Sequence, residues 1–340
     1  MKTAPAAERL LRPEQIALLR KRADWRGLAL VAHAWTVIGL AMALVVYFPH
    51  PLSWLIAIPV IGSRQLGLLI LMHDGAHGML ARRVWLNRLL CQLGCAWPTL
   101  ADADAYRRYH LRHHAHTMQP GDPDLVLTGH YPISRASLWR KLRRDLFGLT
   151  GYAQRRAQLL GALGPADWSW GRRLAHFWRT LGPQSLVNLA LAAVLTAQIG
   201  WYAWPLLWLL PLLTWQQLVL RIRNIAEHAA VPDANDPLRN ARSVRAGWLA
   251  RAFIAPYWVN YHLEHHLLMW VPCYRLPQLH AMLLANGFGS RMAQSAGYRE
   301  VLTEVTRRED NGGGEPRRPR AVGTFGEGFA ATGAGELNPR

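Results

Sequence analysis

The 340-residue sequence has little cysteine, and its three cysteines, Cys91, Cys95 and Cys273, complete no metal-binding or disulfide pattern. A zinc or iron–sulfur site built on cysteine needs further thiols, so we expect three reduced side chains and no disulfide framework. The sequence also lacks the GxGxxG fingerprint of flavin- and dinucleotide-binding proteins and the His-Pro-Gly-Gly segment of haem-binding domains. Residues 1–27 contain no short apolar core of a cleavable signal peptide, so we expect none.

Acidic residues are also few, since 21 Asp and Glu stand against 39 Lys and Arg, for a net charge of +18. In a soluble protein this excess would raise the question of nucleic-acid binding. Here the basic residues lie in segments that flank apolar stretches, which is typical of the cytoplasmic loops of membrane proteins. We therefore expect no nucleic-acid partner, and attraction to anionic lipid headgroups instead.

Long apolar stretches are present and predict four membrane spans. Residues 28–48 carry no charged side chain, and residues 52–72 follow after Pro49-His50-Pro51, interrupted only by Arg64. As one helix, 28–72 would be about 68 Å long, more than twice the thickness of a bilayer core, so it must fold back as a hairpin. The same argument divides 184–222 into two spans that turn near residues 200–205. Arg64 either contacts a polar substrate head or extends to the membrane surface from a tilted helix.

The charge distribution predicts the orientation of these spans. Residues 1–27 hold seven Lys and Arg against three acids, residues 101–182 hold thirteen against six, and the two hairpin tips hold none. The positive-inside rule places both termini and the middle loop in the cytoplasm, most simply at a bacterial inner membrane. The predicted fold is all-α, with four transmembrane helices in two hairpins and a cytoplasmic helical cap.

The chain divides into three predicted parts. A cytoplasmic N-terminal segment covers residues 1–27, a membrane domain covers 28–308, and a Gly-, Pro- and Arg-rich tail covers 309–340. We expect the tail to be disordered. Two apolar stretches, 89–100 and 249–258, are too short to span and should lie at the interface or cap the site. Pro277 is predicted to open a short amphipathic helix.

Nine histidines form a pattern with helical spacing. They occur in His73-Asp-Gly-Ala-His77, His110-Leu-Arg-His113-His114, Asn224-Ile-Ala-Glu-His228 and His262-Leu-Glu-His265-His266. Spacings of three and four residues bring side chains onto one helix face, and neutral imidazole is a common metal ligand. Nine ligands are too many for one metal and about right for two. The predicted topology puts all nine on the cytoplasmic side, where they could meet. That side holds the metal site in the predicted fold.

The order HxxxH, HxxHH, NxxxH, HxxHH, between about Arg64 and His280, resembles the integral-membrane fatty acid desaturase and hydroxylase superfamily. Asp122-Pro-Asp124, Asn260-Tyr-His262 and Leu276-Pro277 are similar to flanking segments of bacterial desaturase-like members. The resemblance implies a non-haem di-iron centre held by the nine histidines, with Asn224 contacting one iron through water. The spacer between His73 and His77 is shorter than in many acyl-CoA desaturases, which puts that subclass in doubt. Ligand type alone would suit iron, copper, zinc or nickel, so the resemblance is what favours iron.

Acidic residues near the nine histidines are expected to offset the metal charge by accepting the other imidazole N–H. Asp74, Glu227 and Glu264 lie beside ligand positions, Asp102, Asp104, Asp122 and Asp124 flank the second box, and at least two of the seven should act so. We favour Asp74, Glu227, Glu264, Asp122 and Asp124. His116 extends the second box but is not needed to complete it. The remaining histidines are expected at the surface or in packing: His33, His50, His130, His176 and His280.

The resemblance implies an oxidoreductase of lipid metabolism that uses O2 and an external electron donor, of ferredoxin or cytochrome type, to desaturate its substrate. That substrate would be a fatty acyl chain from the bilayer, either in an acyl lipid or linked to a carrier. A hydroxylase or a carotenoid ketolase or hydroxylase of the same superfamily is the nearest alternative, because these reactions share the first hydrogen abstraction. The HDGAHG start and HLEHH box are also similar to carotenoid-modifying members. A membrane metal transporter is an alternative of another class, but it would need ligands along the spans rather than on one side.

Overall fold

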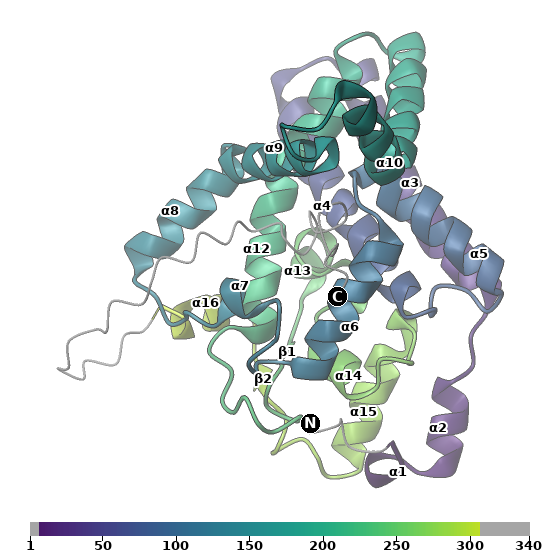
Figure 1. Ribbon diagram of the computed structural model, residues 1–340. Helices are drawn as coiled ribbons and strands as arrows, with labels where there is room; N and C mark the ends of the chain where they lie inside the picture. Colours follow the sequence, from purple (N-terminus) through teal and green to yellow (C-terminus); the bar gives the residue numbers. More distant parts are fainter. Residues whose placement is uncertain (1–6, 307–340) are drawn as a thin grey trace.

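The computed structural model describes residues 7–306, and their regular secondary structure is almost entirely helical (Figure 1). The predicted tail at 309–340 and the last two residues of the predicted domain at 28–308 lie outside the described residues. The strands among residues 7–306 are β1 (Ser243–Val244) and β2 (Gln294–Ser295), which pair in parallel, and Tyr261 forms an isolated bridge with Ser243. The all-α prediction is therefore confirmed for the described residues.

Four helical stretches are long and apolar enough to cross a membrane, as predicted. They are α3 (Asp24–Tyr47), α4 (Pro51–Ala76), α10 (Trp170–Gln198) and the stretch Trp204–His228. Large apolar side chains point outward along them, for example Leu40 at 65% exposed and Leu189 at 63%. Outward apolar surface of this extent is expected where a helix contacts lipid.

Two of these stretches differ in detail from the sequence prediction. α10 begins at Trp170 rather than near residue 184, and Pro183 lies inside it. The fourth stretch is divided into a π-helical turn at Trp204–Leu209, α11 (Leu210–Leu213) and α12 (Trp215–His228). Pro205 and Pro211 lack the N–H of a regular helix, and Thr214 departs from helical geometry with φ −116° and ψ −89°. Apolar composition predicted the length of this span but not its break.

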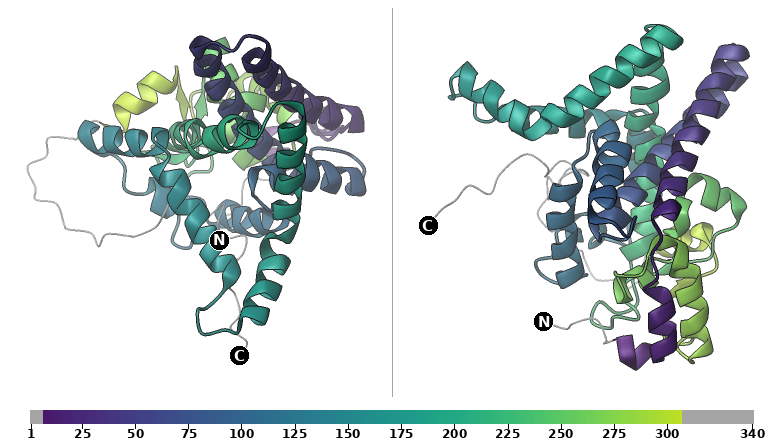
Figure 2. Two further views of the ribbon diagram at one scale, coloured as in Figure 1. Left: turned by 90° about the horizontal axis from the view of Figure 1, so that it is seen from above. Right: turned by 90° about the vertical axis from the view of Figure 1, so that its right-hand side faces the viewer.

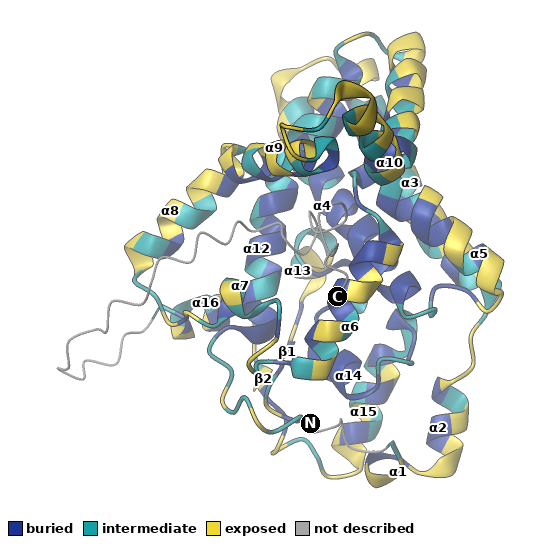
Figure 3. Cartoon of the chain, viewed as in Figure 1, coloured by how far each residue is buried: buried dark blue, intermediate teal, exposed yellow. Residues whose placement is uncertain are grey.

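Helix α4 lies at the centre of the molecule and packs against α3, α12 and α6 (Ala103–His116). Its second half, from Ile61 to Ala76, is buried throughout, as the dark blue helix in Figure 3 shows. The π-helical segment η1 (Leu90–Ala96) lies against its end, where a Cβ on Gly75 would come 2.6 Å from the Cys91 sulfur. Only glycine allows this approach, which fixes the end of α4 that carries the first histidines.

Both short apolar stretches pack against α4. η1 and η2 (Trp97–Thr99) cover part of 89–100, while α13 (Trp248–Phe253) and η4 (Pro256–Trp258) cover part of 249–258. Arg64 is buried in α4, donates to the Ala252 carbonyl oxygen and lies 5.6 Å from the centre of the Tyr257 ring. It therefore does not extend to the membrane surface and instead ties α4 to this segment.

Shorter helices gather around the ends of the long ones. At one end lie α1 (Ala7–Leu10), α2 (Pro13–Leu19), α14 (His262–Leu267) and α15 (Leu276–Ala285), as Figures 1 and 2 show. Pro277 stands in the first turn of α15, as predicted. The others are α5 (Val84–Leu89), α7 (Leu125–Thr128), α8 (Arg135–Leu146), α9 (Leu149–Leu163), η5 (Cys273–Arg275) and α16 (Tyr298–Glu304).

Candidate metal centre

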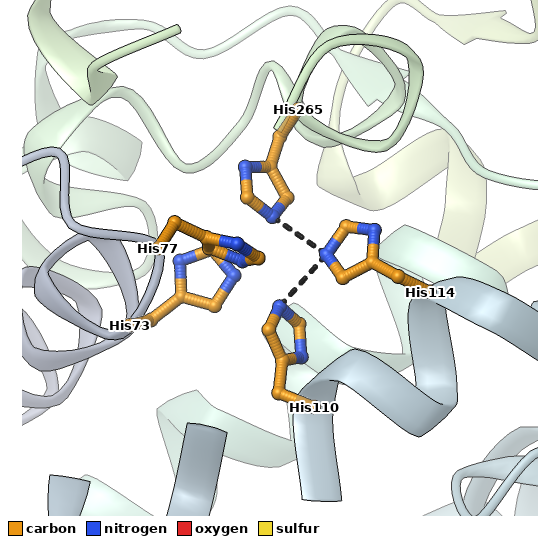
Figure 4. A group of neighbouring side chains, drawn as sticks. All are labelled: His73, His77, His110, His114 and His265. Atoms are coloured by element: carbon orange, nitrogen blue, oxygen red, sulfur yellow. Dashed lines mark hydrogen bonds between the residues drawn. The ribbon is translucent and has the colours of Figure 1, made fainter. Parts of the chain in front are cut away.

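All nine histidines singled out in the sequence converge, and they do so in two groups. The first group is His73, His77, His110, His114 and His265, and the second is His113, His228, His262 and His266. Within each group the potential ligand atoms all lie within 4.8 Å of one another. Figure 4 shows the five rings of the first group turned toward a common centre. His116 belongs to neither group and is half-buried.

Helical geometry divides the histidine boxes between the two groups. His110 and His114 are four residues apart on α6 and share a face, whereas His113 is rotated about 100° from His114 and faces the second group. The box on α14 divides in the same way, with His262 and His266 together and His265 apart. His73 and His77 end α4, and His228 ends α12.

The second group is a closed ring of Nε2 atoms. The Nε2 of His113 lies 3.1 Å from that of His228 and 3.2 Å from that of His266. The Nε2 of His262 lies 2.9 Å from that of His228 and 3.0 Å from that of His266. Each of these distances allows a hydrogen bond only if one of the two nitrogens carries a hydrogen.

The partners of the Nδ1 atoms indicate that Nδ1, and not Nε2, carries the hydrogen in these rings. His113 Nδ1 is 2.8 Å from an Asp122 oxygen, and His228 Nδ1 is 3.3 Å from the Asn240 carbonyl oxygen. Both partners only accept, so in each neutral ring Nδ1 donates and Nε2 presents a lone pair. His266 Nδ1 meets the Thr117 hydroxyl at 3.2 Å, and that hydroxyl donates to the His113 carbonyl oxygen. Facing lone pairs repel each other, and a bound cation is what satisfies them.

The first group also contains imidazole nitrogens that face one another or lack a hydrogen-bond partner. The Nε2 of His114 lies 2.9 Å from that of His110 and 3.0 Å from that of His265, as the dashed lines in Figure 4 mark. The Nε2 atoms of His73 and His77 are buried and have no hydrogen-bond partner. Unpaired buried nitrogen is costly in a folded protein, and a metal ion would pair both atoms at once.

Burial also keeps most of these rings uncharged. Burial lowers the pKa of His77 to about 3 and holds the pKa values of His110, His114 and His265 well below the usual range. His113 differs, because burial is outweighed by Asp124 and Asp122, which raise its pKa. Neutral imidazoles are nitrogen donors suited to iron, copper, zinc or nickel. The residues present therefore fit two bound transition-metal ions.

Three of the predicted acids face an imidazole. Asp122 accepts from His113, and Asp124 lies 3.5 Å from the same Nδ1 while accepting from the Tyr109 hydroxyl. Glu227 lies 3.4 Å from His262 Nδ1. These carboxylates stand where they can fix the orientation of the imidazole rings.

The other predicted acids contact different groups. Asp74 accepts from the Cys273 backbone N–H at 3.1 Å. Asp102 caps α6 by accepting from Ala105 N–H at 2.8 Å, and Asp104 forms an exposed ion pair. Glu264 is fully buried and accepts from the Ser243 hydroxyl, with His280 Nδ1 at 2.5 Å from its other oxygen. His280 was predicted as a surface or packing residue, and this contact was missed because no spacing links it to α14.

Two further residues near the groups were not predicted. Arg223 is buried and pairs with Glu227 at 2.6 Å, one turn away on α12. Tyr106 stacks on His110, with ring centres 5.1 Å apart. Both lie four residues from a predicted residue, and this helical spacing could have identified them.

A cavity of about 50 Å³ adjoins the second group between α6, α9 and α12. His113, His228 and His262 line it, and Leu127 and Leu220 add apolar surface. The predicted Asn224 is also part of this lining. A substrate that entered here would lie directly against the imidazoles.

Comparison with known proteins agrees with this arrangement. The chain is 27% identical over 302 residues to dihydrorhizobitoxine desaturase of Bradyrhizobium elkanii, covering 80% of this chain and 79% of that protein. It is 25% identical over 287 residues to sn-1 oleoyl-lipid 12-desaturase of Anabaena variabilis, covering 74% and 77%. The model of the fatty acid desaturase family matches residues 49–292, which include all nine histidines. Because this match covers more than half of the chain, the protein belongs to the fatty acid desaturase family.

Proposed function

We propose that the protein is an integral-membrane, O2-dependent di-iron oxidoreductase that introduces a double bond into a fatty acyl chain. The observation that supports it best is the convergence of nine imidazoles into groups of five and four, with lone pairs that face one another. Both relatives are named desaturases, which favours desaturation over hydroxylation or ketone formation. One of them is named for an acyl-lipid substrate.

In this proposal each group of histidines holds one iron. Asn224 contacts one iron through a water, and Asp122, Asp124 and Glu227 hold the rings that they face. Asp74 accepts from the Cys273 N–H and Glu264 bonds to Ser243 and His280, so both support the segments that carry the histidines. Iron with O2 supplies the strong oxidant that an unactivated alkyl C–H bond requires, which redox-inert zinc does not.

The chain's own residues select which C–H bonds react. The cavity beside His113 and His262 is lined by side chains of five helices, α6, α7, α9, α12 and α14, so its shape is set by helix packing. Leu127 and Leu220 offer apolar contact to a methylene chain. Placement decides which carbon pair is attacked, because methylenes are chemically alike.

Electrons must come from outside the chain. Removing two hydrogens from the substrate while O2 becomes two waters consumes two further electrons and two protons. We propose a ferredoxin- or cytochrome-type donor that docks on the basic segments predicted to be cytoplasmic, residues 1–27 and 101–182. The four spans form two hairpins in a bacterial inner membrane, with both termini and the metal centre in the cytoplasm.

Untargeted lipid mass spectrometry of a host that expresses the protein tests this proposal. The wild type, together with a ferredoxin and its reductase, should produce acyl species that lack two hydrogens. His265→Ala should not produce them, because it removes a ligand from the first group. His116→Ala is the matched control, since His116 is on α6 but outside both groups, and it should behave as wild type.

A species that gains oxygen instead would contradict desaturation and support the hydroxylase alternative. Equal product from His265→Ala and wild type would contradict the role of the histidines. If no product forms, the iron content of the purified proteins still distinguishes an unsuitable host from an incorrect proposal.

A further inference from the structure

A second, larger cavity meets the metal centre at different histidines from the first. It measures about 370 Å³ and is lined by the end of α6 and the turn after it, by the segment that follows α12, and by His266 of α14. We call it the polar cavity, and we call the cavity of about 50 Å³ beside the second group the substrate cavity. Among residues 7–306 no residue lines both, so the histidines adjoin two separate cavities.

The polar cavity extends from the surface to both groups of histidines. Ala115 and Asn235 in its lining are exposed, whereas His266 is buried. His114 of the first group and His266 of the second stack on each other, with ring centres 4.3 Å apart, and both line the cavity. A small molecule that enters from the surface therefore meets one histidine of each group.

Hydrogen bonds fix the walls of the polar cavity. Thr117 lines it, and its hydroxyl oxygen lies 3.2 Å from His266 Nδ1. Gln119 Nε2 donates to the Ala234 carbonyl oxygen at 2.7 Å, which joins the turn after α6 to the segment after α12. The cavity is thus bounded by residues that are bonded to one another and to a histidine of the second group.

The two cavities differ in the charge of their linings. The substrate cavity is lined by two carboxylates, Asp124 and Glu227, and by one guanidinium, Arg223. Within residues 7–306, no Asp, Glu, Lys or Arg lines the polar cavity, which instead presents neutral polar groups such as Gln119 and Asn235. Amide groups hydrogen-bond both water and anions, and no carboxylate is present there to repel an anion. The polar cavity therefore suits water and small anions better than the substrate cavity does.

The proposed reaction requires such a second cavity. In each turnover the substrate loses two hydrogens, and O2 takes up these, two further electrons and two protons to become two waters. An acyl chain against the histidines fills the small substrate cavity. Protons and water must then pass between the metal centre and solvent elsewhere, and a polar lining serves this better than an apolar one.

We propose that the polar cavity is the route by which water and small anions exchange with the metal centre, while the acyl chain occupies the substrate cavity. This inference rests on the proposed function, because the route leads to the two irons that the histidines are proposed to hold. Ala115 on α6 and Ala234 in the segment after α12 are the small side chains that leave room for this exchange.

The test follows azide, a small anion, as it binds to the oxidised, iron-loaded, full-length protein in lipid nanodiscs. Azide on ferric iron absorbs visible light, so stopped-flow mixing gives a binding rate constant. Ala115→Trp combined with Ala234→Trp should lower this rate constant at least about tenfold, because crowded side chains must move before azide passes. Each single variant should lower it by a smaller factor, and either one replaces the double variant if that protein does not fold. Ala136→Trp is the matched control, since Ala136 is exposed on α8 and lines neither cavity.

Leu127→Trp distinguishes the two cavities, because Leu127 lines the substrate cavity and not the polar cavity. It should keep the wild-type rate constant for azide. A lower rate constant in Leu127→Trp with none in the double variant would overturn the proposal, and so would equal rate constants in the double variant and the wild type.

Iron content of the same samples separates this inference from the proposed function. A double variant that holds two irons and binds azide as fast as wild type contradicts the route alone. A wild type that holds no iron contradicts the proposed function, and this inference with it.

Discussion

The carboxylate of Asp122 orients His113, whose Nε2 faces two other histidines of the second group. Its Oδ1 accepts from His113 Nδ1, and its two oxygens also accept the backbone N–H groups of Met118 and Asp124. These bonds fix both the position of the ring and the side from which its lone pair points. His113 Nε2 is in turn the atom that faces both His228 and His266.

Replacing Asp122 by Ala should therefore weaken iron binding. Loss of a carboxylate that orients a ligand imidazole lowers metal affinity roughly 10–100-fold. The measurement is the iron retained by purified protein during titration with a chelator. Asp104→Ala is the control, because Asp104 is exposed and pairs with Arg88, and it should retain iron as wild type does. Similar curves for the two variants would show that Asp122 does not orient His113.

At the residue scale, sequence spacing identified the nine histidines and three of the acids that face them. It did not identify the residues whose partners come from distant segments. His280 reaches Glu264 only because α15 packs on α14, and Gln154 lines the cavity beside the second group only because α9 lies against the fourth span. Such contacts depend on tertiary packing, which has no periodic signal in one sequence.

At the scale of elements, α9 is positioned by direct backbone contact with the broken fourth span. A Cβ added to Gly151 would lie 2.4 Å from the Leu213 carbonyl oxygen and 2.7 Å from the Leu213 Cα. Leu213 ends α11, next to the break at Thr214. The glycine thus lets α9 approach the segment that leads into α12 and the cavity beside the second group. Hydropathy predicted the span, whereas the break and the packing of α9 require the three-dimensional structure.

Gly151→Ala should consequently destabilise the protein. Backbone atoms cannot move aside as a flexible side chain can, and overpacking of this kind costs about 1–3 kcal/mol. Gly171→Ala is the matched control in α10, where a Cβ would meet nothing within 4 Å, and alanine should be neutral or stabilise the helix by up to about 1 kcal/mol. Unfolding of the two purified variants in mixed micelles with increasing SDS gives the comparison. An unchanged midpoint for Gly151→Ala would contradict the close contact.

At the scale of the whole molecule, the nine histidines meet in one region beside a cavity. They come from α4 and α12, which belong to two of the four apolar stretches, and from the shorter helices α6 and α14. The sequence predicted this convergence, because charge and hydropathy predict that every box lies on the same side of the membrane. The division into five and four follows from helix rotation within each HxxHH box. That each of the two groups binds one iron is the central claim of the proposed function.

Iron content per chain tests that claim most directly. Protein purified from iron-supplemented cells should contain two irons per chain by mass spectrometry, one for each group of histidines. His114→Ala and His266→Ala, each in a different group, should both lower this number, while His116→Ala should keep two. A wild-type protein that holds zinc or less than one iron per chain, or group variants that still hold two, would contradict the di-iron account.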